Sequence, residues 1–311
     1  MTAKRMTNLS PIVLFVYNRP WHTRQTLEAL SKNILADQSK LYIYADGPKE
    51  NATEEQLQKI KEVRKLLREK KWCREVEIIE REKNIGLSDS IINGVTQIVN
   101  KYGKIIVLED DLVTSVGFLK YMNEALDLYE KYEKVMYISG YMFPVKAKLQ
   151  ETFFVISACP WGWATWKRGR ELFEDNAKKL LDEIIFKNLD NEFNFNGSYP
   201  FTEMLKAQVE NKLDSWDIIW YASVFLKNRL CLFPRKSLVR NIGHDETGVH
   251  CKKSWLSNIY NKQEIADNIK VEPIEIIESK KAREAMRKFY ISLGNPPLWV
   301  RAKEKMKIIL K

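Results

Sequence analysis

Residues 104–111 read Lys-Ile-Ile-Val-Leu-Glu-Asp-Asp, an apolar run that ends in three consecutive carboxylates. So uniform an apolar run is typical of a strand buried on both faces, as in a parallel sheet covered by helices. In such a sheet the ligand site lies at the carboxyl ends of the strands, where hard oxygen ligands suit Mg²⁺ or Mn²⁺. We therefore expect Glu109, Asp110 and Asp111 to form a cation site, although an acidic turn that caps a helix near Val116 is the simpler alternative.

Strand and helix patterns alternate on either side of this stretch. Apolar runs predict strands, and apolar residues at helical spacing predict helices between them. The expected strands are 11–17, 41–45, 76–79 and 105–108, and the expected helices follow residue 20, cover 53–71 and follow residue 86. This alternation predicts an α/β fold, a Rossmann-like, mostly parallel sheet flanked by helices.

The composition is that of a globular protein with a large core, since 45% of the 311 residues are apolar. No apolar run approaches the roughly 20 residues that span a bilayer, and the N-terminus has no signal-peptide pattern, so we expect a cytoplasmic protein. Cys73, Cys159, Cys231 and Cys251 are far apart and form no C-x-x-C pair. This spacing favours free, buried thiols over a zinc site or disulfides.

The positive charge is concentrated at the C-terminus. The net charge is +10, and residues 279–311 alone hold ten Lys or Arg and two Glu, a net +8. Within this segment, 298–311 fits a basic amphipathic helix with Trp299 on its apolar side, which is typical of a helix lying on an anionic membrane surface. Packing of its apolar side on the parent domain is the equally weighted alternative. Nucleic acid is not an expected partner, because no known binding motif is visible.

Four motifs at the predicted strand ends resemble those of GT-A glycosyltransferases. They are Asn18-Arg19-Pro20, Ala45-Asp46-Gly47-Pro48, Asn84-Ile85-Gly86-Leu87 and Leu108-Glu109-Asp110-Asp111. Each is weak alone, but their order along residues 11–251 is similar to that of bacterial family 2-like sugar transferases and of the N-acetylglucosaminyltransferase I branch. The resemblance implies a catalytic domain over residues 1–255 and a C-terminal helical extension over 256–311.

The resemblance implies a nucleotide-sugar donor bound by the first half of the domain, about 10–112, and an acceptor bound by about 113–255. Asp46 matches the acid that contacts the base, and Val16, Asn18 and Arg19 would line the same pocket. Arg19 is also placed to touch phosphate.

Within the acidic motif, the resemblance makes Asp111 the direct ligand of Mn²⁺ or Mg²⁺. Glu109 and Asp110 would then face the sugar and ribose of the donor. Glu109 departs from the commoner Asp-x-Asp motif but matches the Glu-Asp-Asp variant of the N-acetylglucosaminyltransferase I branch.

A second carboxylate is needed to take the proton from the acceptor hydroxyl. Asp217 lies between Trp216 and a run of large apolar residues, where desolvation raises a carboxyl pKa. It also resembles the inverting base of the same branch, so it is the predicted catalytic residue. A helix cap is the alternative role, and Asp214 and then Glu203 are the next candidates.

Residues 159–166 hold three of the nine tryptophans, with small residues between them. Indole faces pack on the apolar sides of sugar rings, so Trp161 and Trp163 are predicted donor or acceptor contacts, while others of these indoles belong to the core.

The late loop 241–250 contains two of the three histidines. The resemblance favours His250 over His244 as a further metal ligand, with Asp245 supporting the loop, and a polar turn with a surface histidine is the alternative. The remaining histidine, His22, is expected only to start a helix.

These observations predict a metal-dependent, inverting glycosyltransferase that moves a sugar, with a UDP-sugar favoured, to a glycan acceptor that is lipid-linked at the inner membrane face. The setting that fits is bacterial surface-polysaccharide assembly. A sugar-nucleotide nucleotidyltransferase is one alternative, although its Gly-rich phosphate loop is missing after the first strand. A basic metal-dependent nucleic-acid-binding protein or nuclease is the other, and strong salt dependence of binding would reveal it.

Overall fold

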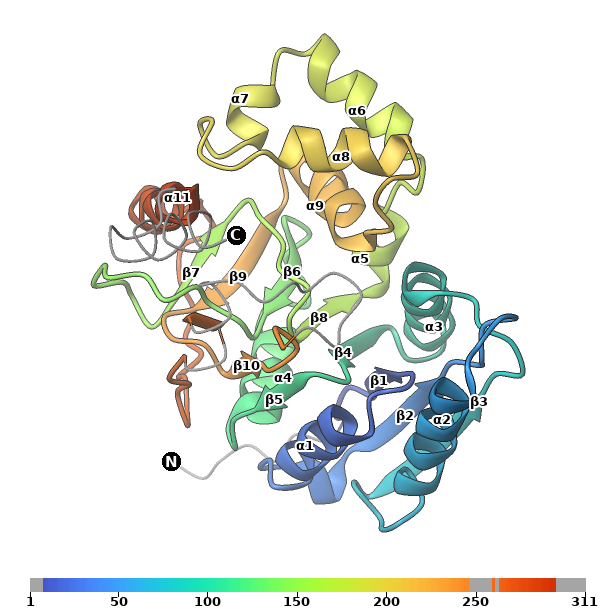
Figure 1. The fold of residues 1–311 in the computed structure, drawn as a ribbon. Coiled ribbons are helices and arrows are strands. Elements are labelled where there is room, and N and C mark those ends of the chain that lie inside the picture. Colours follow the sequence, from blue (N-terminus) through green and yellow to red (C-terminus); the bar gives the residue numbers. More distant parts are fainter. Residues whose placement is uncertain (1–7, 246–258, 261–262, 295–311) are drawn as a thin grey trace, which may run out of the picture.

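The computed structural model describes residues 8–245, 259–260 and 263–294. An eight-stranded sheet forms its centre, with the strand order β3-β2-β1-β4-β8-β6-β9-β7 (Figure 1). These strands are β1 (Ile12–Val16), β2 (Lys40–Ala45), β3 (Glu75–Glu80), β4 (Lys104–Glu109), β6 (Val135–Ser139), β7 (Thr152–Val155), β8 (Trp163–Trp166) and β9 (Leu230–Pro234). All pairings are parallel except those of β8 and β7. The predicted mostly parallel sheet is therefore confirmed.

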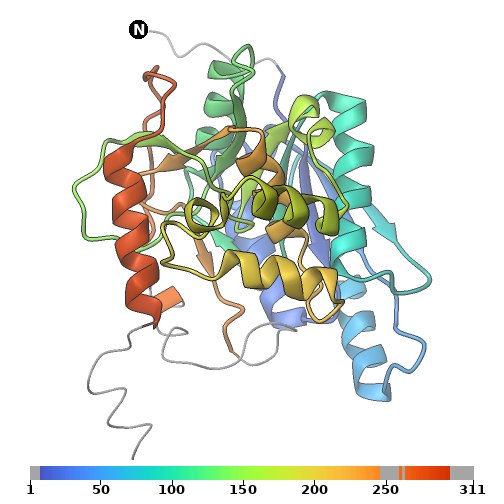
Figure 2. The ribbon, with the colours of Figure 1, turned by 90° about the horizontal axis from the view of Figure 1, so that it is seen from above.

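Helices cover both faces of the sheet (Figures 1 and 2). The described ones are α1 (Pro20–Ser31), the short 3-10 turn η1 (Ala36–Gln38), α2 (Glu54–Leu66), α3 (Leu87–Tyr102), α4 (Phe118–Leu128), α5 (Lys167–Glu171), α6 (Ala177–Phe186), α7 (Asp190–Phe193), α8 (Phe201–Val209), α9 (Trp216–Leu226) and α11 (Lys280–Gly294). The first three predicted helices are confirmed, with α2 ending five residues earlier than its apolar pattern suggested.

Every residue of β1 is buried, and the side chains alternate between two cores. Ile12, Leu14 and Val16 pack with residues of α1, α2 and α4 on one face. Val13 and Phe15 belong to the core on the other face, which extends from α3 through α9 to α11. Burial on both faces explains the near-continuous apolar sequence of the central strands.

Strand β4 ends at Glu109, and the chain turns at once into a strand that the sequence did not predict. This strand, β5 (Leu112–Thr114), pairs antiparallel with β10 (Val239–Asn241) in a separate two-stranded sheet. The Ile242 N–H continues the contact by donating to the Asp111 carbonyl at 2.9 Å. The late loop that follows β10 is thereby held beside the acidic motif.

Helices α6, α7 and α8 form a lobe that packs through α6 and α8 on α9 (Figure 1). Helix α11 packs beside β7 (Figure 1), and the Glu278 carboxylate accepts from the Ile156 N–H at 2.9 Å. The same helix also reaches the lobe, since Arg283 donates to the Glu192 carbonyl of α7 at 2.9 Å. Part of the region assigned to the C-terminal extension therefore packs on the central sheet. The predicted amphipathic helix 298–311 lies outside the described residues.

Two further predictions concern thiols and membrane spans. Cys73, Cys159 and Cys231 are buried and free, as expected, while Cys251 lies outside the described residues. Within the part of the chain that the structure describes, no helix combines the length and apolar character needed to cross a bilayer.

Candidate active site

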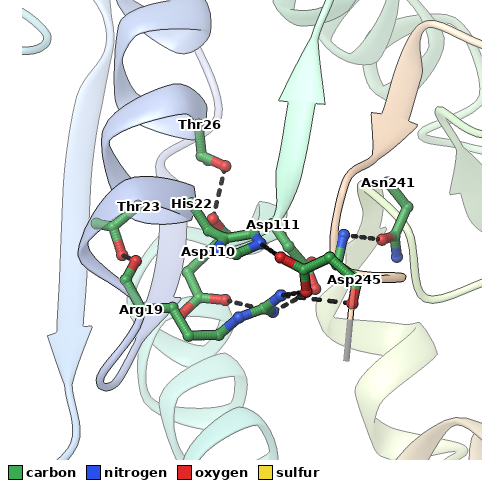
Figure 3. Close-up of polar contacts among 9 residues, drawn as sticks. Arg19, His22, Thr23, Thr26, Asp110, Asp111, Asn241 and Asp245 are labelled. Carbon is green, nitrogen blue, oxygen red and sulfur yellow. Dashed lines mark hydrogen bonds and ion pairs between the residues drawn. The ribbon is translucent and has the colours of Figure 1, made fainter. Parts of the chain in front are cut away.

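Arg19 is the centre of a polar cluster at the carboxyl ends of β1 and β4 (Figure 3). Its Nη1 donates to Asp111 Oδ2 at 2.7 Å and lies 3.5 Å from Asp110 Oδ1. Its Nη2 lies 3.5 Å from Asp245 Oδ1 and 3.5 Å from the Gly243 carbonyl oxygen. One guanidinium thus joins three segments that are far apart in the sequence.

Local packing fixes the backbone around this cluster. The Thr23 N–H and hydroxyl both donate to the Arg19 carbonyl, at 3.0 and 2.9 Å, in the first turn of α1. The Thr26 hydroxyl donates to the Asp110 carbonyl at 2.8 Å. Helix α1 therefore positions both Arg19 and the acidic turn whose charge Arg19 offsets.

Gly243 allows the late loop to approach the acidic motif. A Cβ atom at this position would collide with the Asp111 carboxylate. The Gly243 N–H is held by the Asn241 side-chain oxygen at 2.8 Å. A side chain here would force the Asp111 carboxylate to move, since the loop backbone lies directly against it.

His22 belongs to the cluster, although the sequence analysis expected it only to start a helix. It is buried in α1, and its Nε2 lies 3.0 Å from Asp245 Oδ2. Burial and the neighbouring Arg19 charge lower its pKa, against the opposing effect of Asp245. His22 is therefore held as a neutral imidazole that fixes the Asp245 carboxylate.

The carboxylates of the motif repel one another. Burial, followed by the charge of Asp111, raises the pKa of Asp110 to about 7, although Arg19 and the Tyr17 N–H oppose the change. Burial and the charges of Asp111, Asp110 and Asp217 raise the pKa of Glu109 well above its usual value. Both carboxyl groups are therefore held toward their neutral forms, and a further positive charge beside them would favour the charged forms.

Asp46, predicted to contact a base, is buried at the carboxyl end of β2 and organises the Asn-x-Gly turn. Its carboxylate accepts from the Asn84 side chain at 2.8 Å, and from the Gly47, Ile85 and Gly86 N–H groups at 2.9 to 3.3 Å. Two motifs that the sequence presents 38 residues apart are therefore one structural unit. This unit sets the start of α3, next to the β1 loop.

Val16 and Asn18 lie in the positions predicted for them, at the end of β1 and in the loop before α1. Val16 is buried, and its carbonyl accepts from the Asp46 N–H at 3.0 Å. Asn18 is half-buried. Val16 and Asn18 therefore lie at the same edge of the sheet as Asp46, and their contact with a nucleotide stays a prediction.

Asp217 lies in the first turn of α9, half-buried, and accepts a hydrogen bond from the Ser215 hydroxyl. Its charge raises the pKa of Glu109, so the two carboxylates lie within electrostatic range. Asp214 accepts instead from the Ser88 hydroxyl at the start of α3. Glu203 is paired with Lys206 on the surface of α8, 2.8 Å away. Of the three candidate bases, Asp217 is the one whose charge contributes to the raised pKa of Glu109.

The two tryptophans predicted as sugar contacts have different environments. Trp163 is 1% exposed, and its ring stacks between Tyr137 and Trp216 with centroids 5.1 and 5.2 Å away. It is a core residue that offers no ring face to a ligand, because other aromatic rings stack on it. Trp161 is only partly buried and packs edge-on against His244, with centroids 5.4 Å apart.

His244 lies between the Trp161 and Tyr260 rings, 4.7 Å from the latter. Burial lowers its pKa, against the opposing charge of Asp111. His250, the predicted metal ligand, lies outside the described residues. Within those residues, no group of three or more His, Cys, Asp and Glu side chains is arranged as a metal site.

Three carboxylates nevertheless lie close to the Arg19 guanidinium. Asp110, Asp111 and Asp245 present carboxylate oxygens around a single positive group, and carboxylates are the ligands that Mg²⁺ and Mn²⁺ prefer.

Comparison with known proteins gives a distant likeness. No family model matches the sequence, and no curated protein is similar to it. Among solved structures, S. aureus TarS 1–349 has 13% identity and a TM-score of 0.39 over 74% of this chain and 59% of that chain. The longer S. aureus TarS structure has 13% identity and a TM-score of 0.38 over 74% of this chain and 36% of that chain.

Mouse xyloside xylosyltransferase 1, in its apo form, has 10% identity and a TM-score of 0.38 over 70% of this chain and 82% of that chain. The chain thus spans less than two thirds of either TarS structure.

Proposed function

We propose that this protein is a glycosyltransferase that uses a nucleoside-diphosphate sugar, with a UDP-sugar favoured. The observation that carries the proposal is the convergence of the motif residues. Arg19, Asp46 and the 109–111 carboxylates come from three strand ends and lie along one edge of a mostly parallel sheet. That edge is where α/β sheets bind nucleotide ligands.

The proposed reaction depends on Mn²⁺ or Mg²⁺, held by Asp111 with Asp110 and Asp245 beside it. A bound divalent ion would stabilise the negative charge that develops on the departing diphosphate. Arg19 is the cationic side chain already placed to share that task. Glu109 and Asp110 are proposed to face the sugar and ribose, and Asp46 to shape the base pocket through the Asn84–Gly86 turn.

Asp217 is the proposed general base, which takes the proton from the acceptor hydroxyl in an inverting transfer. Its place in the first turn of α9 and its electrostatic effect on Glu109 support this role. Trp161 is proposed to line the acceptor side, since its ring is partly exposed near the late loop.

We further propose a lipid-linked glycan acceptor at the inner face of a cytoplasmic membrane, as in surface-polysaccharide assembly. The support is the basic, amphipathic sequence of residues 298–311. Deletion of 298–311 is expected to weaken binding to vesicles with anionic lipid and to leave binding to neutral vesicles unchanged. Equal binding of both proteins to anionic vesicles would remove this part of the proposal.

Calorimetric titration with UDP, GDP and their sugar conjugates, with and without Mn²⁺, tests the donor class. We expect micromolar binding that requires Mn²⁺ and is lost in Asp111→Ala. Absence of binding to every nucleotide would refute the glycosyltransferase proposal. Binding of DNA or RNA that weakens steeply with salt would favour the nuclease alternative instead.

A further inference from the structure

Asp214 lies in the loop between α8 and α9, just before the helix that carries Asp217. Its carboxylate accepts a hydrogen bond from the Ser88 hydroxyl, in the first turn of α3. The two residues are 126 positions apart in the sequence. Their contact joins the lobe of α6, α7 and α8 to the half of the domain that holds Asp46 (Figure 1). It therefore connects the halves that are proposed to bind the acceptor and the nucleotide.

The Ser88 side of this contact is fixed by Asp46. The Ile85 and Gly86 N–H groups donate to the Asp46 carboxylate at 3.2 to 3.3 Å, so the turn that leads into α3 is held in place. Gly86 is the N-cap of α3, and a Cβ atom on it would lie 3.8 Å from Asp214 Oδ2. The Asp214 carboxylate thus lies beside the N-terminus of the helix, where a negative charge is favourable.

The Asp214 side of the contact is held by helix α8. The Lys212 N–H donates to the Ala207 carbonyl at 2.8 Å, which folds the loop back on the end of this helix. The Ser215 N–H donates to the Gln208 side chain at 2.7 Å. The backbone on both sides of Asp214 is therefore part of the lobe, and the Asp214 side chain extends from it to α3.

The same loop leads directly into Asp217. The Ser215 hydroxyl donates to the Asp217 carboxylate. Trp216, between them, is buried and lines a small cavity together with residues of α3. Apolar packing has no preferred direction, whereas a hydrogen bond fixes a distance and an angle. The bond from Ser88 to Asp214 therefore adds a directional restraint to the start of α9 that the packing of Trp216 does not supply.

We infer that Asp214 is a positioning residue, which through Ser88 holds Asp217 in register with the nucleotide side of the site. This inference rests on the proposed function, and it gives Asp214 a role other than that of the base. Asp214 is exposed, so water competes for its hydrogen bond. We expect loss of the bond to reduce the population of the joined arrangement about fivefold, which corresponds to about 1 kcal/mol.

Release of nucleoside diphosphate from UDP- and GDP-sugars, with water as the acceptor, tests this role. Ser88→Ala and Asp214→Ala are each expected to lower kcat about fivefold and to leave the KM of the donor unchanged, because the nucleotide contacts remain. The double variant should lose no more than either single variant, since both remove the same bond. Asp214→Asn keeps an oxygen that accepts from Ser88, so its kcat should equal that of wild type.

Amide hydrogen exchange in the absence of ligands tests the contact without turnover. We expect residues 214–217 to exchange about fivefold faster in Ser88→Ala and Asp214→Ala, and at the wild-type rate in Asp214→Asn. Asp182→Ala is the matched control, because it removes an exposed carboxylate of the same lobe that pairs with Lys178 at 2.5 Å. It should leave the exchange of residues 214–217 and kcat as they are in wild type.

Two results would overturn the inference. The first is wild-type exchange of residues 214–217 in both Ser88→Ala and Asp214→Ala. The second is a loss of kcat in Asp214→Asn as large as that in Asp214→Ala, because the charge and not the hydrogen bond would then be the group that matters. Failure of the proposed function would look different. Wild type would then release nucleotide from none of the donors, while the exchange rates would still respond to the substitutions at Ser88 and Asp214.

Discussion

Replacing Asp110 with asparagine is expected to stabilise the metal-free protein, and more strongly as the pH rises. The pKa of Asp110 is raised by burial and by Asp111 from its ordinary value of 3.8 to about 7. Between these pH values the folded protein keeps a proton that the unfolded chain has released. Stability therefore falls as the pH rises from about 4 to about 7, and the loss is complete above pH 7.

The size of this effect follows from the interval between the two pKa values. That interval is about three pH units, and each unit corresponds to about 1.4 kcal/mol, so the upper limit is on the order of 4 kcal/mol. Asparagine has nearly the same shape and keeps an oxygen that accepts from the Tyr17 N–H. The substitution therefore removes the charge and leaves a side chain of nearly the same size in place.

Urea unfolding in EDTA at pH 5, 6, 7 and 8, followed by tryptophan fluorescence, measures the difference in stability between Asp110→Asn and wild type. We expect the midpoint of Asp110→Asn to exceed that of wild type by an amount that grows with pH. Asp182→Asn is the control, because Asp182 is exposed and pairs with surface Lys178; its stability relative to wild type should not vary over this range. A variant no more stable than wild type at pH 8 would refute the reasoning.

Three other substitutions probe separate parts of the site. Asp217→Asn is expected to lower turnover by roughly 10²- to 10⁴-fold and to leave Mn²⁺-dependent nucleotide affinity intact. A transfer assay measures turnover and calorimetry measures affinity, and unchanged turnover with lost affinity would contradict the prediction. Gly243→Ala should weaken Mn²⁺ binding because its Cβ collides with the Asp111 carboxylate, whereas Gly294→Ala meets open space and should bind as wild type does; equal Mn²⁺ affinities would contradict this. Asp46→Asn should lower the free energy of unfolding by roughly 2 kcal/mol, since the carboxylate accepts from several N–H groups, and an unchanged denaturation midpoint would show that these bonds contribute little.

The sequence predicts the central strands well because their burial leaves a continuous signal. Strand β4 was expected over 105–108 and covers Lys104–Glu109, all but the last residue buried. The same signal placed Glu109, Asp110 and Asp111 at a sheet edge. Helix α3 follows a four-residue motif and has a regular apolar face, so its start was also predictable.

The contacts between distant segments were not predictable in the same way. Strands β5 and β10 have three residues each and are joined across more than 100 positions, so neither carries enough apolar alternation to be recognised. The placement of Asp245 beside Arg19 and His22 follows from that pairing. A single sequence contains no local pattern that indicates the pairing of β5 with β10.

His22 and Trp163 show that the sequence does not predict the surroundings of individual side chains. His22 occupies a helical position whose pattern does not distinguish core from site, and it contacts Asp245 only because the late loop returns to α1. Trp163 has small neighbours in sequence, which suggested an open surface. Its ring is nevertheless enclosed by Tyr137, Trp216 and Trp220, which come from other elements.

The strand order also has a consequence for synthesis on the ribosome. Strand β9 lies between β6 and β7, although it follows both in the chain, and β8 covers the open edge of β4 only after about 55 further residues. The nascent chain therefore exposes unpaired, apolar strand edges for much of its translation, which is a recognised route to aggregation. Gly243 and Asp245 emerge later still, so the acidic cluster is assembled among the last events. We expect the yield of folded protein to rise when translation is slowed or when chaperones that shield nascent chains are abundant.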